Sequence, residues 1–156
     1  MCIIRCRYAP SKPTQTAAVW DLAYGDSANS TYPGDDRVDI ACFDNYGPGD
    51  YSKALLQDCE AVVGFADARR KVPAICESGV RQGTQNTNIS SWFVSAFLNP
   101  VLASSACSRV AFTYTWRNSR PDSYWVPLKG QATFDSFVEF ARSVHTIFAG
   151  DPRLLA

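Results

Sequence analysis

The chain has 156 residues, of which 46% are hydrophobic and 13% aromatic. This length fits about one domain, and the hydrophobic content is sufficient for a sizeable core. Fifteen basic residues balance fifteen acidic ones, which argues against nucleic acid or an anionic membrane surface as a partner. No apolar run reaches the roughly 18 residues of a membrane helix, and the start, MCIIRCRYAP, is too short and too quickly polar for a secretory signal.

Strands and helices are predicted to alternate along the chain. Four short runs rich in Val, Ile, Phe and Tyr, each bounded by Pro, Gly, Asp or Ser, predict strands. Helical spacing of apolar residues predicts helices between and after them, and Pro100 is expected to kink or shorten one of these. In chain order, the predicted elements are a strand at 2–8, a helix near 15–24, a strand at 37–44, a helix through Leu55, Cys59, Val62 and Ala66, a strand at 72–78, a helix near 90–104, a strand at 109–116 and a helix over 134–148.

This alternation predicts an α/β fold with a parallel sheet. Strands that are apolar along nearly their whole length are typical of parallel sheets, because helices cover both faces of such strands. We therefore expect four strand-helix units with parallel strands, right-handed crossovers and the helices on the outside.

A polar or aromatic residue closes or follows each predicted strand. These residues are Tyr8, then Asp44 and Tyr46, then Glu77, then Trp116 and Arg117. The ligand crevice of a parallel α/β fold lies outside the carboxyl ends of its strands, so we expect these side chains to share one rim. Each also has a simpler interpretation: Glu77 as an acid at a helix start, Trp116 as a core residue and Arg117 as a surface charge.

The six cysteines could form three disulfides, but we expect mainly free thiols. Cys42 and Cys76 lie in strand-like runs and Cys59 in a helical one, where a small buried thiol is the commoner case. Cys2 and Cys6 have no second close pair, and the chain has one His, so a zinc site has little support. No metal and no cofactor is implied.

Two further residues stand out singly. His145 is expected on the last helix, partly buried. Asn88, in NTNISS, is an N-x-S glycosylation acceptor that matters only if the chain is secreted.

Four segments together resemble the C-terminal half of the catalytic domain of glycoside hydrolase family 26, the β-mannanase family. They are YPGDDRVDIACFDNYG (32–47), VPAICESG (72–79), VAFTYTWRN (110–118) and YWVPLKGQATFDSFVEFARSVHTIF (124–148). Each is weak singly, but their order and spacing are fairly specific. The resemblance implies that residues 1–156 form a single partial catalytic domain, a parallel half-barrel that corresponds to strands five to eight of a (β/α)8 barrel.

The resemblance also implies roles for five residues. Glu77 corresponds to the nucleophile of a retaining glycosidase and Tyr46 to the tyrosine beside it. Trp116 corresponds to the tryptophan that stacks on the sugar and Arg117 to an arginine that contacts it. Asp44 is expected to support these groups.

The first four strands of the family barrel, including the acid/base glutamate, have no counterpart in this sequence. Glu60 and Glu139 fall within predicted helices and are interpreted as solvated charges. Asn45, where an acidic residue is expected, and Cys76, directly before the nucleophile position, are smaller departures.

The resemblance implies a retaining endo-β-1,4-mannanase that acts on β-mannan polysaccharide, with this chain carrying the nucleophile half. A β-1,3-xylanase or mixed-linkage glucanase is the alternative within enzymes, and a non-catalytic remnant that binds carbohydrate or assembles is the alternative outside them. A half-barrel leaves strand edges and an apolar inner face open, so we expect self-association. An extracellular location is implied by the resemblance only.

Overall fold

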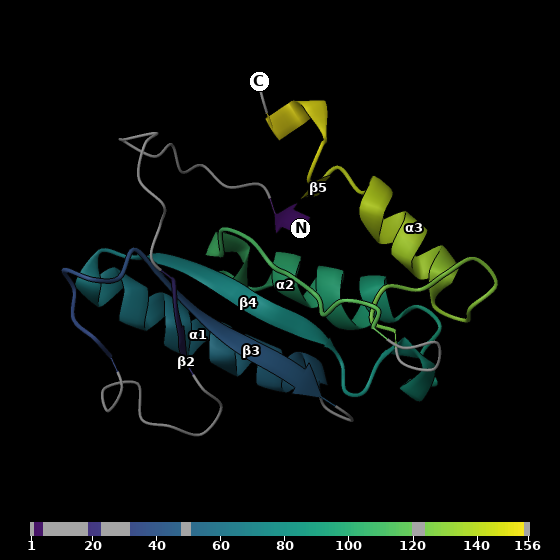
Figure 1. The fold of residues 1–156 in the computed structure, drawn as a ribbon, viewed down its shortest axis with the longest axis horizontal. Coiled ribbons are helices and arrows are strands. Elements are labelled where there is room, and N and C mark those ends of the chain that lie inside the picture. Colours follow the sequence, from purple (N-terminus) through teal and green to yellow (C-terminus); the bar gives the residue numbers. More distant parts are fainter. Residues whose placement is uncertain (1, 5–18, 23–31, 48–50, 120–123, 155–156) are drawn as a thin grey trace.

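The computed structural model describes residues 2–4, 19–22, 32–47, 51–119 and 124–154 (Figure 1). Its centre is a parallel three-stranded sheet in the order β2 (Val19–Leu22), β3 (Ile40–Gly47) and β4 (Val72–Val80). The long helix α1 (Tyr51–Arg69) connects β3 to β4 and lies along them on one face of the sheet (Figure 1). The predicted α/β fold with a parallel sheet is therefore confirmed.

The face of α1 that meets the sheet is the one its apolar spacing predicts. Leu55, Cys59, Val62 and Ala66 are fully buried. They share one hydrophobic core with Ile75 of β4 and with other side chains of the sheet. Side chains three or four residues apart lie on the same side of a helix, so this single stripe holds α1 against both strands.

The predicted strand at 109–116 runs parallel to β4 but makes only one regular bridge, between Thr113 and Ile75. Three further backbone hydrogen bonds join this segment to β4. The Ala111 N–H donates to the Pro73 carbonyl (2.8 Å). In the other direction, the Ile75 N–H donates to the Phe112 carbonyl (3.0 Å) and the Ser78 N–H to the Tyr114 carbonyl (2.9 Å). An irregularity in β4, described below, disturbs the spacing of its backbone groups and so interrupts this ladder. The structure thus has three regular parallel strands where four were predicted.

The N-terminal predictions were wrong in two places. Of the predicted strand 2–8, residues 5–8 lie outside the described ranges, and β1 (Cys2–Ile4) pairs antiparallel with β5 (Thr146–Phe148) in a separate two-stranded sheet. The helix predicted near 15–24 is a strand where it is described, at β2. Trp20 explains this choice, because a strand here lets its ring stack on Phe65 of α1, with ring centroids 5.0 Å apart.

The remaining helices follow β4. The predicted helix at 90–104 consists of η2 (Phe93–Leu98), a wider π-type turn, and α2 (Asn99–Ala103). Pro100 lies in the first turn of α2, where a missing N–H is tolerated. It has no N–H to offer the Ala96 carbonyl four residues earlier, and the Ser52 hydroxyl of α1 donates to that carbonyl (2.9 Å). Short 3-10 turns are η1 (Thr84–Asn86), η3 (Cys107–Arg109) and η4 (Pro152–Leu154).

The last predicted helix is shorter than expected. It is α3 (Phe134–Arg142), and the chain then turns into β5. The Thr146 hydroxyl closes this turn by donating to the Phe140 carbonyl (2.6 Å). His145 is therefore exposed in a turn, not partly buried on a helix, and Val144 is 75% exposed. No helix within the described ranges combines the length and apolar character needed to cross a membrane.

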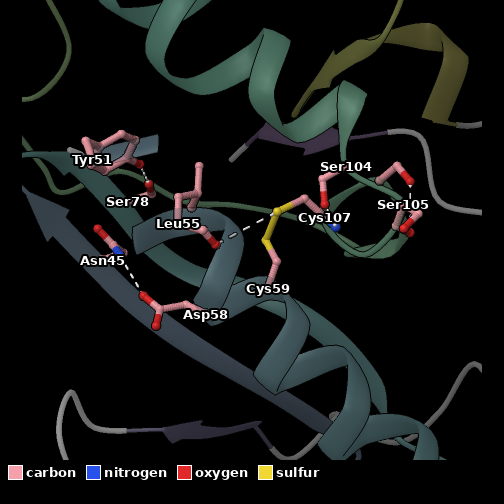
Figure 2. Close-up of a disulfide and its surroundings, with 10 residues drawn as sticks. Asn45, Tyr51, Leu55, Asp58, Cys59, Ser78, Ser104, Ser105 and Cys107 are labelled. Atoms are coloured by element: carbon pink, nitrogen blue, oxygen red, sulfur yellow. Dashed lines mark hydrogen bonds between the residues drawn. A yellow bond between two sulfur atoms is a disulfide. The ribbon is translucent and has the colours of Figure 1, made fainter. Parts of the chain in front are cut away.

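Four of the cysteines form disulfides, so the expectation of free thiols was wrong for them. Cys59 of α1 bonds Cys107 of η3, and Cys42 of β3 bonds Cys76 of β4 (Figure 2 shows the first). The Cα–Cα distances are 5.1 Å and 5.4 Å, within the usual range for a disulfide. Burial was predicted for Cys42, Cys59 and Cys76: the first two are fully buried, and Cys76 is half-buried. The pairing of the cysteines depends on which elements become neighbours, which a periodic pattern does not specify.

Candidate active site

A β-bulge in β4 turns Glu77 away from α1. Phe43 of β3 pairs with Ile75 of β4. The next residue of β3, Asp44, pairs with Glu77, so Cys76 is an extra residue in β4. Side chains alternate between the faces of a regular strand, and Ile75 points into the core shared with α1. In a regular strand Glu77 would point to the same face as Ile75, toward α1. With the bulge, Glu77 lies with Asp44 on the opposite face of the sheet, here called the open face.

Tyr46 holds the Glu77 carboxylate in place. Its hydroxyl donates to Glu77 Oε2 (3.0 Å) and accepts the backbone N–H of Trp116. Burial, followed by the negative charge of Glu77 and this hydrogen bond, raises the pKa of Tyr46 far above its ordinary value. Tyr46 therefore remains a protonated donor across the physiological range, and its hydroxyl joins β3, β4 and the 110–117 segment.

Two aspartates form a carboxyl pair beside Glu77. Asp21 of β2 and Asp44 of β3 share a side-chain hydrogen bond. Burial, then the charge of Asp21 and this bond, raises the pKa of Asp44 to about 6. Burial also raises the pKa of Glu77, while its hydrogen bond from Tyr46 opposes the increase. The pair can thus hold a proton close to Glu77 at mildly acidic pH.

Substituting Asp21→Asn should lower the pKa of Asp44 from about 6 toward its ordinary 3.8. The substitution removes the neighbouring negative charge that penalises ionisation of Asp44 and leaves its burial unchanged. Carboxyl-carbon NMR titration measures the shift directly. Asp36→Asn, an exposed aspartate before β3, is the matched control and should leave that titration unchanged. If the pKa of Asp44 is unchanged in Asp21→Asn, burial alone sets the pKa of Asp44.

The carboxyl groups line an open cavity of about 570 Å³. Trp116 is 41% exposed, so it is not a core residue, and the Arg117 guanidinium lies 5.9 Å from the centre of its ring. Within the described part of the chain, no three His, Cys, Asp or Glu side chains are arranged to hold a metal ion. The cavity is lined by Asp21, Asp44, Cys76, Glu77, Tyr114, Thr115, Trp116 and Arg117. The structure therefore brings all five predicted site residues together, Tyr46 through its bond to Glu77.

Besides Tyr114 and Thr115 of the cavity lining, three further residues of this region were not predicted. Asp21 was overlooked because 15–24 was interpreted as a helix. If VWDL had been interpreted as a strand, the single polar residue in it would have indicated a site residue. Trp125 lies edge-on to Tyr46, with ring centroids 6.5 Å apart. Asn118 fixes the backbone at Trp125, because its Oδ1 accepts hydrogen bonds from the backbone N–H groups of Trp125 (2.9 Å) and Val126 (3.0 Å). No pattern in the sequence connects these distant positions.

Asn45, the departure noted in the sequence, lies on the other side of the sheet. It is buried, and its amide donates to Asp58 Oδ2 of α1 (2.6 Å; Figure 2). Asn45 therefore fastens α1 to β3 and does not line the cavity.

Gly79→Ala should displace Tyr46 from Glu77 and destabilise the fold by about 1–3 kcal/mol. A methyl group at Gly79 would lie 3.1 Å from Tyr46 Cε1 and 3.0 Å from Trp125 Cδ1, tighter than most real contacts, so these two rings would have to shift by a few tenths of an ångström. Loss of the bond to Glu77 should lower the pKa of Tyr46, measured by absorbance titration against Tyr46→Phe.

The matched control for this prediction is Gly64→Ala. Gly64 is exposed on α1, and a methyl group there would have no neighbour within 4 Å. Alanine is favoured over glycine in helices by about 1 kcal/mol, so this variant should unfold at a higher denaturant concentration than the wild type. If Gly79→Ala also gains stability and keeps the Tyr46 titration, the packing described around Gly79 is wrong.

Comparisons with known proteins show what the chain resembles. No protein-family model matches it. An endo-beta-1,4-mannanase from Cellulomonas fimi, solved as a double mutant, is 30% identical with a TM-score of 0.76, over 86% of this chain and 32% of that chain. A catalytic domain of a family 26 endo-beta-1,4-mannanase from Bacillus sp. JAMB-750 is 28% identical with a TM-score of 0.68, over 80% and 37%.

A family 26 β-mannanase from Bacteroides ovatus shares the fold, with a TM-score of 0.74 at 24% identity over 86% of this chain and 39% of that chain. The chain spans about a third of the length of the Cellulomonas fimi mannanase. The resemblance predicted from the motifs is confirmed: over most of its length the chain is similar in sequence and fold to part of the endo-β-mannanases of glycoside hydrolase family 26.

Proposed function

We propose that this chain carries the nucleophile side of a retaining glycoside hydrolase site that acts on β-1,4-mannan. The observation that carries the proposal is the hydrogen bond from Tyr46 to Glu77 (3.0 Å) at the wall of an open cavity, in a chain similar to β-mannanases. In this proposal, residues 1–156 form one partial catalytic domain. The parallel strands and the 110–117 segment correspond to consecutive strands in the C-terminal half of an eight-stranded barrel.

The chemistry assigned to Glu77 is attack on the anomeric carbon. One carboxylate oxygen forms an ester bond to C1 as the bond from C1 to the leaving oxygen breaks, and water later hydrolyses this ester with net retention. Tyr46 orients the attacking carboxylate and favours its charged form through its donated hydrogen bond. Trp116 offers an apolar ring face and Arg117 a planar set of donors, which suit a pyranose ring and its hydroxyls.

The leaving oxygen also needs a proton. A retaining site places the acid about 5–5.5 Å from the nucleophile. Glu60 and Glu139 are exposed on α1 and α3, and the described residues place no second glutamate at the cavity. We propose that the acid comes from a polypeptide segment that covers the open face, supplied by other sequence or by self-association, with Asp44 as the alternative within the chain.

Trapping of the covalent intermediate tests this proposal. Dinitrophenyl 2-deoxy-2-fluoro-β-mannoside, called the fluoromannoside below, needs no acid, because dinitrophenolate leaves with the electron pair unaided. It should esterify the protein once, and peptide mass spectrometry should locate the sugar on Glu77. The xylose and glucose analogues, run in parallel, separate the two alternative substrate classes from mannan. A label on another residue, or no label with any of the three sugars, would contradict the proposal.

A further inference from the structure

The bulge that presents Glu77 is held by groups on both sides of it. On the far side, Ser78 is buried and hydrogen-bonds the Tyr51 hydroxyl of α1 (Figure 2). Val80 then returns to the hydrophobic core. On the near side, the extra residue Cys76 bonds Cys42 of the neighbouring strand. Glu77 therefore lies between a residue fastened to α1 and a residue fastened covalently to β3.

The disulfide crosses the place where the strand register changes. Cys42 pairs across the sheet with Ala74, two residues before Cys76, so the bond runs diagonally along β4. The register changes directly after Phe43, which follows Cys42. A bulge weakens the backbone ladder around it, because the extra residue has no partner opposite. The covalent bond therefore restrains β4 where its hydrogen bonds restrain it least.

From this geometry we infer that the Cys42–Cys76 disulfide positions the nucleophile, by fastening the bulge that sets Glu77 against Tyr46 on the open face. The inference rests on the proposed role of Glu77. The disulfide touches no reacting atom, so Cys42 and Cys76 are positioning residues. Their effect should appear in the alignment and ionisation of Glu77, beyond any effect on the stability of the fold.

The test compares two double variants of the 156-residue chain, Cys42→Ala/Cys76→Ala and Cys59→Ala/Cys107→Ala. The second is a matched control, because each removes one disulfide and the bridged cysteines are separated by similar stretches, 34 and 48 residues. Their constraints on the unfolded chain are therefore similar. Cys59 and Cys107 join α1 to η3, on the side of the sheet away from Glu77.

We expect the fluoromannoside to label Glu77 about 10- to 100-fold more slowly in Cys42→Ala/Cys76→Ala, the loss typical of a nucleophile displaced by about 1 Å. The control should keep close to the wild-type rate. The second measurement is the NMR titration of the Glu77 carboxyl carbon, which needs no sugar. The pKa of Glu77 should shift only in Cys42→Ala/Cys76→Ala, because Glu77 would move relative to the charged and titratable groups that face it. These groups are Asp21, Asp44, Tyr46, Tyr114 and Arg117.

Equal labelling rates and equal Glu77 titrations in the two double variants would overturn the inference. If the wild type is not labelled, the proposed function fails, and the titration alone decides whether the disulfide positions Glu77. If Cys42→Ala/Cys76→Ala does not fold, Cys42→Val/Cys76→Ser replaces it, since Val fills the volume of the buried Cys42. If Glu77 titrates in that variant as it does in the wild type, the inference is equally contradicted.

Discussion

A protein made of residues 1–156 should cleave mannan about 10²- to 10⁴-fold more slowly than it cleaves a dinitrophenyl β-mannoside. Proton transfer to the leaving oxygen typically contributes a factor of this size. A mannan chain leaves as a basic alkoxide that needs the proton, whereas dinitrophenolate does not. Among the described residues Glu77 has its hydrogen-bonding tyrosine but no second glutamate at the cavity. Release of reducing sugar and release of dinitrophenolate give the two rates.

A series of aryl β-mannosides sharpens this comparison. The rate should fall steeply as the pKa of the departing phenol increases, because no acid compensates for a poorer leaving group. A flat series, with mannan cleaved as fast as the dinitrophenyl compound, would mean that an acid acts within the chain. Asp44, whose pKa is raised to about 6, would then be the first residue to replace, as Asp44→Asn.

Glu77→Ala should lower the hydrolysis of the dinitrophenyl β-mannoside by about 10⁴-fold or more, the scale on which catalysis is lost with a nucleophile. Added azide should restore part of the rate. In the space left by the carboxylate, azide attacks C1 as dinitrophenolate leaves, and the product is the α-mannosyl azide with inverted configuration. The configuration of this product, determined by NMR, identifies Glu77 as the missing nucleophile in a way that a loss of folding could not imitate.

Glu139→Ala is the matched control for this variant. Glu139 is an exposed glutamate on α3, and its replacement should leave the rate unchanged and yield no azide product. If Glu77→Ala keeps its activity, or if azide returns only free mannose, Glu77 is not the nucleophile. It would then be a carboxylate held at a strand for a structural reason.

The sequence predicted the parts of the fold that depend on local pattern. The buried stripe of α1, from Leu55 to Ala66, followed from helical spacing, and β4 followed from an apolar run with clear boundaries. Tyr46, Glu77 and Trp116 were predicted to share a rim because parallel strands end at the same edge, and they lie together. These inferences needed no knowledge of which strands are neighbours.

The features that the sequence did not predict depend on contacts between distant segments. β2 is a strand because it pairs with β3 and places Trp20 on Phe65, while its own short sequence suits a weak helix equally well. The first apolar run is recognisable as a strand, but its partner at 146–148 could not be identified from periodicity. The bulge at Cys76 was also invisible, because an unbroken apolar run carries no sign of the register on the neighbouring strand.

The two disulfides alternate along the chain, with Cys42 and Cys76 interleaved with Cys59 and Cys107. During synthesis from the N-terminus, Cys42 meets Cys59 before either native partner has emerged. Oxidation at that point would join the wrong two thiols, and a thiolate must then attack that bond to exchange them. The Cys42–Cys76 pair become neighbours only once β3 and β4 have docked, and the Cys59–Cys107 pair only once η3 has docked on α1. Recovery of the oxidised protein after complete reduction should therefore be limited by reshuffling and accelerated by a disulfide isomerase.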